Sequence, residues 1–249
     1  MSEQHPFGAP VTFQVEGRPY EAHYGDGLLE TLRKYGYEVP SLCHHEAVSP
    51  YGACRLCLVE VVDKRGRRKI TTSCNFPVQP GIDVRLDTPD VVRHRRVVLE
   101  LLLAMAPRSP ELQALAAEHG VTTGRLEPDE TAEDCILCGL CERVCREVVG
   151  ANAIAMSARG TAKKMTTPYD AENPACIACG ACVYVCPTKC IGLEEADGQR
   201  TIVRWGRTLP LAVCEQTGRA FTPRFLLEHY AQELGGLDEK VFRKAPPYR

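Results

Sequence analysis

Twelve of the fourteen cysteines fall into three groups whose spacing is typical of iron–sulfur ligands. Two groups share the pattern Cys-x2-Cys-x2-Cys-x3-Cys, in residues 135–145 and 176–186. Three thiolates two residues apart on one loop can reach three irons of a 4Fe–4S cube, and the fourth thiolate serves the neighbouring cube. The pattern therefore predicts two 4Fe–4S clusters, one on Cys135, Cys138, Cys141 and Cys186, and the other on Cys176, Cys179, Cys182 and Cys145.

These two groups are an internal repeat. Residues 135–145 and 176–186 agree at every cysteine and at an internal glycine, Gly139 or Gly180. Such a repeat predicts two copies of one supersecondary unit, in which the glycine lets the backbone approach inorganic sulfide and the fourth cysteine starts a helix. Structural zinc also binds four cysteines, but it is usually held by two paired Cys-x2-Cys units rather than by two complete four-cysteine runs.

The third group lies nearer the N-terminus and is less typical. Cys43, Cys54, Cys57 and Cys74 are separated by ten, two and sixteen residues, whereas the plant-type 2Fe–2S pattern has four residues in the first gap. Two thiolates per iron would complete a 2Fe–2S cluster. The spacing alone favours that cluster and leaves structural zinc or unligated thiols open.

A small β-rich domain is expected to position this group. Apolar alternation in residues 11–15 and 18–24, around Glu16-Gly17, predicts a hairpin. Residues 27–35 have helical spacing, with Asp26 as the predicted N-cap. Further strands are predicted at 58–62, 69–73 and 82–86. A hairpin, a helix and additional strands suggest a β-grasp domain over residues 1–87.

The rest of the chain is expected to form three parts, which gives an α+β protein. Residues 88–128 read as a helical connector, with Thr88 as an N-cap before a helix to Met105, a second helix at 111–119, and a polar linker at 122–134. Residues 129–192 are the predicted bacterial-type two-cluster ferredoxin domain. Residues 193–249 are a C-terminal extension with a helix at 223–234 and no assigned chemistry.

Composition narrows the classes of function. The net charge of −2 and the pI near 6.4 give no support for nucleic-acid binding. The most apolar run, residues 97–106, is far short of the ~20 residues that cross a bilayer, and the N-terminus does not resemble a signal peptide. A cytoplasmic protein is therefore expected, in which clustered cysteines indicate metal rather than disulfides.

No catalytic signature accompanies the cysteines. The sequence contains no Gly-x-Gly-x-x-Gly after a strand, no Walker loop, and no signature of a flavin or nicotinamide site. Three redox centres without a substrate site indicate an electron-transfer protein that needs partners at both ends.

Three segments carry a resemblance to a known family. Residues 40–44 (Pro-Ser-Leu-Cys-His), 51–61 and 95–103 are similar to the iron–sulfur (diaphorase small) subunit of NAD-linked hydrogenases. That family is related to the N-terminal part of the large iron–sulfur subunit of complex I and to modules of NAD-dependent formate dehydrogenases. The resemblance covers residues 10–190.

The resemblance implies cofactors and partners. It makes Cys43, Cys54, Cys57 and Cys74 the ligands of one 2Fe–2S cluster, facing a flavoprotein that oxidises or reduces NAD(P)(H). The 4Fe–4S pair would pass electrons to or from a catalytic subunit of hydrogenase, formate dehydrogenase or electron-bifurcating type. The chain would then belong to a hetero-oligomer, with no membrane span and no nucleic acid.

The chain departs from the family in one segment. Relatives usually carry a His-x3-Cys-x2-Cys-type segment after the helix, which holds an additional 4Fe–4S cluster with one histidine ligand. Here no cysteine lies between Cys74 and Cys135. We expect that cluster to be absent, with His94 and His119 at the surface or at helix ends, and three clusters in total.

Three other classes of protein share part of this cysteine pattern. A stand-alone multi-cluster ferredoxin fits the same cysteines. The iron–sulfur subunit of succinate dehydrogenase or fumarate reductase lacks a second complete four-cysteine run, and a cluster-based redox sensor would need a DNA-binding element that the sequence does not show. Cys190 and Cys214 are expected to be packing thiols. His44 and His45 either tune the first cluster by hydrogen bonding or face solvent.

Overall fold

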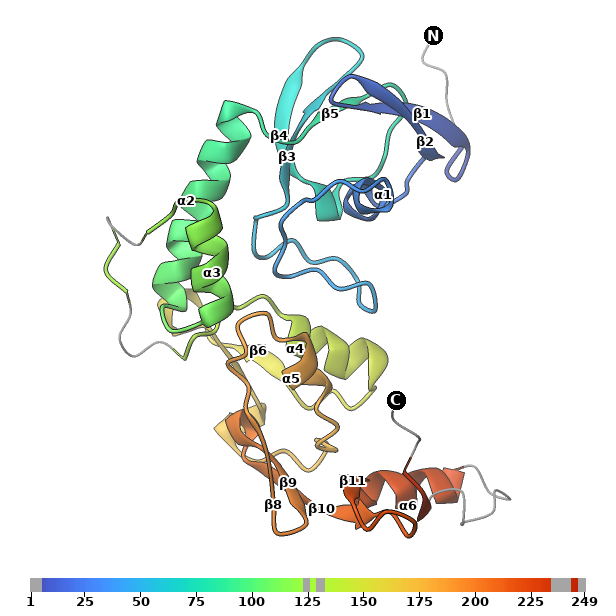
Figure 1. Cartoon of the computed structure of the whole chain (residues 1–249), viewed down its shortest axis with the longest axis vertical. Coiled ribbons are helices and arrows are strands. Elements are labelled where there is room, and N and C mark those ends of the chain that lie inside the picture. The colour runs from blue at the N-terminus through green and yellow to red at the C-terminus, as the bar shows by residue number, and fades with distance from the viewer. Residues whose placement is uncertain (1–5, 123–125, 129–132, 234–242, 246–249) are drawn as a thin grey trace. The chain divides into compact units, whose positions relative to one another are not determined.

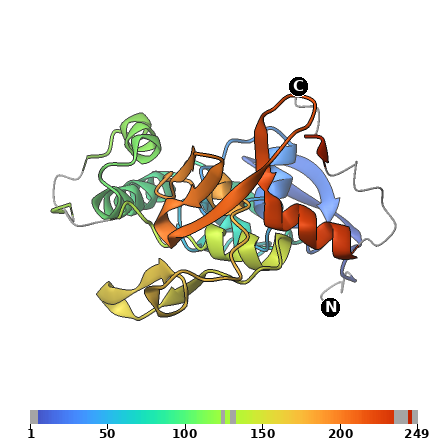
Figure 2. The same ribbon diagram turned by 90° about the horizontal axis from the view of Figure 1, so that it is seen from below.

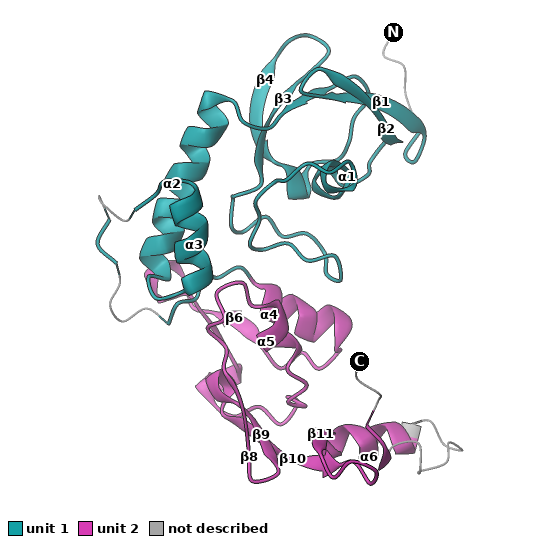
Figure 3. Ribbon diagram, in the orientation of Figure 1, with its two compact units in different colours: residues 1–138 teal, residues 139–249 magenta. Residues whose placement is uncertain are grey.

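The computed structural model describes residues 6–122, 126–128, 133–233 and 243–245. It divides into two compact units, residues 1–138 and 139–249 (Figure 3). The division falls inside the first cysteine run, between Cys138 and Gly139. Each unit is described by itself, and the four-part division expected from the sequence stays a prediction.

The first unit begins with a five-stranded mixed sheet. Its strands are β1 (Pro10–Val15), β2 (Arg18–His23), β3 (Leu58–Val62), β4 (Arg68–Thr72) and β5 (Asp83–Arg85), in the order β2-β1-β5-β3-β4. Strands β1 and β5 are parallel and the other pairs are antiparallel. Helix α1 (Leu28–Lys34) packs on the sheet's inner face (Figure 1). The expected β-grasp arrangement and the α+β class are confirmed.

Apolar alternation builds the core of this sheet. Val11, Phe13 and Val15 point inward from β1 while the residues between them are exposed, as the period of two requires. They pack with Leu28 and Leu32 of α1. The core therefore lies between the sheet and α1, directly behind the strand that follows Cys57.

Removal of the Phe13 ring is expected to destabilise this domain strongly. Phe13 is fully buried, and truncating a buried phenylalanine to alanine costs about 3–5 kcal/mol through lost burial and the cavity left behind. Phe13→Ala should therefore lower the urea midpoint of the cluster-loaded chain, followed by far-UV circular dichroism. The matched control is Phe7→Ala, because Phe7 is 81% exposed; equal midpoints for the two variants would contradict the placement of Phe13 in the core.

The predicted cap of the first helix is wrong. Gly27, not Asp26, is the N-cap of α1, and no side chain caps that end. The Asp26 carboxylate instead accepts the backbone N–H of His23 at 2.9 Å, so it closes the turn after β2. The sequence shows an aspartate before a helix but not which of two turns uses it.

Two helices follow the sheet. Helix α2 (Pro89–Met105) is capped by Thr88, whose hydroxyl accepts the N–H of Val91, as predicted. Helix α3 (Pro110–Glu118) starts with Ser109 as its cap and packs along α2. The linker predicted at 122–134 lies largely outside the described residues.

The second unit consists of short elements around the remaining cysteines. Its helices and strands are α4 (Leu140–Arg143), the π-helical turn η2 (Val144–Val148), β6 (Ala155–Ser157), β7 (Lys164–Thr166), α5 (Ala181–Val185), β8 (Leu193–Ala196), β9 (Gln199–Ile202), β10 (Arg207–Val213), β11 (Ala220–Pro223) and α6 (Arg224–Glu233). Strands β6 and β7 form a hairpin between the two cysteine runs.

The C-terminal extension is a folded sheet. Strands β8 to β11 form a four-stranded antiparallel sheet in the order β11-β10-β9-β8. Helix α6 lies alongside the long strand β10 (Figure 2) and begins one residue after the start predicted from the sequence. Among the helices that the structure describes, none is both long and apolar enough to cross a bilayer.

Candidate iron–sulfur sites

The four cysteines of the N-terminal group lie together and buried in the first unit. Cys43, Cys54 and Cys57 come from the loop between α1 and β3, and Cys74 comes from the 3-10 turn η1 (Ser73–Asn75) after β4. Backbone N–H groups point at two of the sulfurs: Leu42 donates to Cys54 Sγ and Cys54 donates to Cys43 Sγ, each at 3.4 Å. Such donors stabilise negative charge on sulfur.

The four thiols are also hydrogen-bonded to one another, which shifts their pKa values. Hydrogen bonds from Cys54 and Cys74 hold the pKa of Cys43 far down, at about 2. A hydrogen bond from Cys74 lowers the pKa of Cys57 to about 6. The same contacts raise the pKa values of Cys54 and Cys74, because each gives its proton to a neighbour. Four buried thiols at this spacing fit a group that needs thiolate ligands.

The loop backbone requires a glycine beside the second ligand. Gly52 has φ +73°, and a Cβ added there would stand 2.4 Å from the Asn75 side-chain nitrogen. The next residue in the left-handed region is Arg55, φ +57°, between the two closely spaced ligands. In this loop the successive Ala53 and Cys54 N–H groups point at the Cys43 sulfur, an arrangement that favours anionic groups.

Arg95, in the third segment of the resemblance, fixes the strand after Cys57. Its guanidinium is buried and donates to the Leu58 carbonyl at 2.6 Å and to Asp87 Oδ1 at 2.8 Å. The Ser73 hydroxyl donates to the Cys57 carbonyl at 2.9 Å. Helix α2 and the turn carrying Cys74 are thereby attached to the same strand.

The two cysteine runs repeat in backbone geometry as well as in sequence. Leu137 and Ala178 have φ of +53° and +50°, and Gly139 and Gly180 have φ of +70° and +82°. Both non-glycine residues are therefore held in a conformation that costs roughly 1–2 kcal/mol per residue. Backbone strain shared by two copies at the same position is typical of a functional site.

The prediction that the fourth cysteine starts a helix is wrong. Helices α4 and α5 begin at Leu140 and Ala181, so the third cysteine of each run occupies the first turn. Of the fourth cysteines, Cys145 lies within the π-helical turn and Cys186 lies just beyond α5 in extended conformation. The glycine before the helix needs the left-handed backbone, and this sets the start earlier than the cysteine spacing suggests.

A cavity in the second unit is lined by cysteines of both runs. Cys176, Cys179 and Cys182 line it together with Cys145 of the first run, and the other lining residues include Ile154 and Ile202. The Ala153 N–H donates to Cys145 Sγ at 3.3 Å. Burial raises the pKa of Cys145 and Cys176, and that of Cys182 to about 12. The structure thus brings together four of the predicted ligands, in the crossed combination.

The other predicted ligands are divided between the units. Cys135 (half-buried) and Cys138 (buried) end the first unit, and Cys141 and Cys186 are buried in the second. Cys186 Sγ lies 3.7 Å from Cys190 Sγ. Among the described residues, no three histidine, cysteine or carboxylate side chains converge in the geometry of a single metal ion.

The two cysteines outside the three groups, Cys190 and Cys214, both lie in the second unit. Cys214 is buried in the extension, where its sulfur accepts the Ala245 N–H at 3.2 Å. Hydrogen bonds, first that of Thr217, lower the pKa of Cys214 to about 7. Cys190 is half-buried beside Cys186. The interpretation of both as packing thiols stays a prediction.

The histidines occupy positions of two kinds. His94 is exposed on α2, where its ring contacts the Asp90 carbonyl at 2.6 Å, and His119 is the C-cap of α3. Both lie where the sequence suggested. The His44 side chain is 6% exposed, with Nε2 3.4 Å from Glu30, whereas His45 Nδ1 accepts the exposed Ala47 N–H. Of this pair, His44 is the one turned inward.

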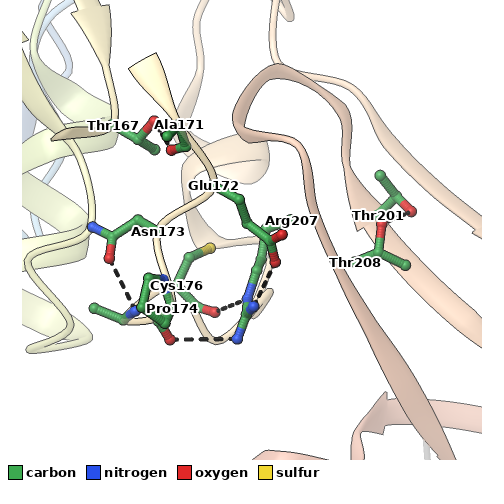
Figure 4. A network of polar contacts seen from close by, with 10 residues as sticks. Thr167, Ala171, Glu172, Asn173, Pro174, Cys176, Thr201, Arg207 and Thr208 are labelled. Atoms are coloured by element: carbon green, nitrogen blue, oxygen red, sulfur yellow. Dashed lines mark hydrogen bonds and ion pairs between the residues drawn. The ribbon is translucent and has the colours of Figure 1, made fainter. Parts of the chain in front are cut away.

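Sequence reasoning missed the residues of the extension that contact the second run. The Trp205 indole N–H donates to Cys182 Sγ at 3.4 Å, and both groups are buried. Arg207 donates to the carbonyls of Cys176 at 2.8 Å and Pro174 at 3.4 Å, and pairs with Glu172 (Figure 4). The signal available was Trp205 itself, because it is the single tryptophan of the chain.

Family comparisons agree with the two kinds of site. Residues 8–89 match the 2Fe-2S iron-sulfur cluster binding domain, and residues 134–190 match the 4Fe-4S dicluster domain. Iron–sulfur chemistry of both kinds is therefore shown at the level of the domain families.

Curated relatives match over most of this chain but over little of their own length. The NADPH-Fe(3+) oxidoreductase subunit alpha of Geobacter sulfurreducens is 32% identical over 72% of this chain and 23% of its own. The NADP-reducing hydrogenase subunit HndD of Solidesulfovibrio fructosivorans is 28% identical over 72% of this chain and 35% of its own. The chain thus spans about a quarter to a third of these relatives.

A solved structure matches over more of its length. A chain of an NAD+-reducing [NiFe]-hydrogenase, determined in the H2-reduced state, superposes with a TM-score of 0.55 at 31% identity. The match covers 64% of this chain and 75% of the hydrogenase chain. At 31% identity over 75% of the hydrogenase chain, and with both domain families matched, the chain belongs to the family of iron–sulfur (diaphorase small) subunits of NAD-linked hydrogenases, which is related to the N-terminal part of the complex I large iron–sulfur subunit.

Proposed function

We propose that this chain carries electrons through one 2Fe–2S and two 4Fe–4S clusters, between a flavoprotein that oxidises NAD(P)H and a catalytic oxidoreductase subunit. Four buried cysteines, Cys43, Cys54, Cys57 and Cys74, would hold the 2Fe–2S cluster. One 4Fe–4S cluster would use Cys135, Cys138, Cys141 and Cys186, and the other Cys176, Cys179, Cys182 and Cys145.

The cysteine-lined cavity of the second unit carries this proposal. Three of its thiols belong to one run and Cys145 belongs to the other, which is the exchange expected of a two-cluster ferredoxin. The lining between the sulfurs is apolar, with Ile154, Ile177 and Ile202. An apolar lining excludes water and leaves the thiolates as the only strong ligands for iron.

The residues of the chain prepare the sites for electron transfer. Iron–sulfur clusters supply one-electron redox chemistry when bound. The protein fixes ligand positions, stabilises thiolate charge with backbone donors such as the Cys54 and Ala153 N–H groups, and buries ten of the twelve proposed ligands, with Cys135 half-buried and Cys179 exposed. These are the levers that set cluster potentials.

Iron and sulfide analysis of the purified chain tests the cluster count. One 2Fe–2S and two 4Fe–4S clusters give about ten irons and ten sulfides per chain, whereas the additional histidine-ligated cluster of the relatives would give about fourteen irons. About fourteen irons would contradict the proposed count. Zinc without sulfide would contradict the cluster assignment altogether.

The subunits that co-purify with the chain test the proposed position in a complex. Affinity purification from the native cells should recover a flavin-containing, NAD(P)H-binding subunit and a catalytic subunit, which mass spectrometry and flavin fluorescence identify. A fully loaded chain that elutes alone at its own mass of 27.5 kDa would instead support the stand-alone ferredoxin.

A further inference from the structure

The C-terminal extension contacts the loop that carries Cys176, Cys179 and Cys182. Between β9 and β10, a 3-10 turn of residues 203–205 places Trp205 against this loop, 4% exposed. Its indole N–H donates to Cys182 Sγ at 3.4 Å. Both partners lie in the second unit.

This hydrogen bond is favourable when the sulfur is negative. A buried tryptophan N–H needs an acceptor; a neutral thiol is a weak acceptor, whereas a thiolate makes a charge-assisted hydrogen bond about twice as strong as a neutral one. The pairing thus suits Cys182 as a metal-bound thiolate better than as a free thiol.

Two arginines of the same sheet hold the extension on the loop. Arg207 donates to the Cys176 carbonyl at 2.8 Å, and Arg200 to the Ala178 carbonyl at 3.5 Å (Figure 4 for Arg207). Each guanidinium is paired with a carboxylate at 2.6 Å, Glu172 for Arg207 and Glu195 for Arg200. These ion pairs offset part of the arginine charge, and the indole N–H is the group that donates to the Cys182 sulfur.

We propose that the C-terminal extension is a tuning cap, in which the Trp205 N–H raises the reduction potential of the 4Fe–4S cluster that Cys182 helps to hold. Hydrogen bonds to ligand sulfur raise the potential because they stabilise the extra negative charge of the reduced cluster. The step is the arrival of one electron, with no bond made or broken. The inference rests on the proposed ligand assignment, and its test separates the two.

Replacing Trp205 by phenylalanine tests the cap. Trp205→Phe keeps an aromatic ring and removes the N–H, so we expect one of the two 4Fe–4S midpoints in an EPR-monitored redox titration to fall. A tenfold loss in the reduction equilibrium constant corresponds to about 59 mV for one electron. The other 4Fe–4S cluster and the 2Fe–2S cluster should keep their midpoints.

The matched control is Thr208→Val in the same sheet. The hydroxyls of Thr201 and Thr208 are 2.8 Å apart and exposed, and within the described part of the chain neither bonds to the cysteine loop (Figure 4). Thr208→Val therefore removes a hydrogen bond of the extension and should move no midpoint. If Trp205→Phe loses the cluster, Trp205 can instead be replaced with benzothienylalanine, which has the shape of tryptophan but no N–H. The midpoint of that variant is then compared with the wild-type midpoint.

Isotope labelling gives a spectroscopic check of the contact. Because the chain has one tryptophan, 15N-labelled tryptophan marks residue 205 alone, and pulsed EPR of the reduced protein should show 15N coupling to one 4Fe–4S signal. Three results would overturn the proposed effect of Trp205 on the reduction potential. They are unchanged midpoints in the variants that lack the indole N–H, an equal fall of the midpoint in Thr208→Val, and the absence of 15N coupling. A wild-type chain without two 4Fe–4S signals would contradict the proposed function itself, and the cap with it.

Discussion

Replacing Cys145 and Cys176 together by alanine is expected to remove one 4Fe–4S cluster, whereas replacing Cys145 and Cys135 together is expected to remove two. The reason is the crossed assignment, in which Cys145 lines the cavity of Cys176, Cys179 and Cys182. Iron should fall from about ten to about six per chain in the first double variant and to about two in the second. Iron analysis and EPR spin quantitation of the reconstituted proteins measure both.

The comparison is a double-mutant cycle on cluster content. The iron losses from two ligands of one cluster do not add, because the first substitution already abolishes that cluster. The iron losses from ligands of two different clusters do add. Cys190→Ala is the matched control, since Cys190 lies near Cys186 without belonging to a run, and it should keep about ten irons. The reverse pattern, with one cluster lost in the pair of Cys135 and Cys145, would assign Cys145 to its own run.

The second large effect is expected at Cys57. Cys57→Ser should abolish the 2Fe–2S signal and leave about eight irons, because one iron would lose a buried thiolate of its pair. The visible spectrum should change accordingly, and the thermal midpoint of the first unit should fall, because the cluster stabilises only the folded chain. EPR at a temperature where the 2Fe–2S signal is resolved, with circular dichroism, measures both effects.

Cys214→Ser is the control for this experiment. Cys214 is as buried as Cys57, at 2% against 1% exposure, so loss of a buried thiol is matched while the predicted ligand sets stay intact. This variant should keep the 2Fe–2S signal. A Cys57→Ser chain that retained that signal, or a wild-type chain with zinc in its place, would contradict the assignment of the N-terminal group.

Short-range patterns predicted much of this protein. Alternation in β1 required only that one face of a strand be buried, and the Thr88-Pro89 pair that begins α2 is a local signal. The repeated cysteines predicted two equal loops, and the backbone of Leu137 and Ala178 shows that equality. Each of these features depends on residues within a few positions of one another.

Features that depend on distant partners could not be read from the sequence. Trp205 reaches Cys182 across 23 residues, and Arg95 reaches Leu58 across 37. Only the folded chain brings these groups together. The predicted Asp26 cap was wrong for a related reason, because the Asp26 carboxylate accepts the His23 N–H in the turn after β2 and does not cap α1. The preference of aspartate for helix N-caps does not show whether its carboxylate caps a helix or closes a neighbouring turn.

The strained backbone at Leu137 and Ala178 has a consequence for how readily the two cysteine loops open before a cluster is bound. Each residue costs roughly 1–2 kcal/mol in the left-handed region, and a cluster bound by the neighbouring thiols would offset this cost in the proposed sites. Without a cluster the two loops would open more readily, and local opening governs attack by proteases. We therefore expect chains without clusters to be cleaved faster by a protease in vitro than cluster-loaded chains, with the first cuts in these two loops.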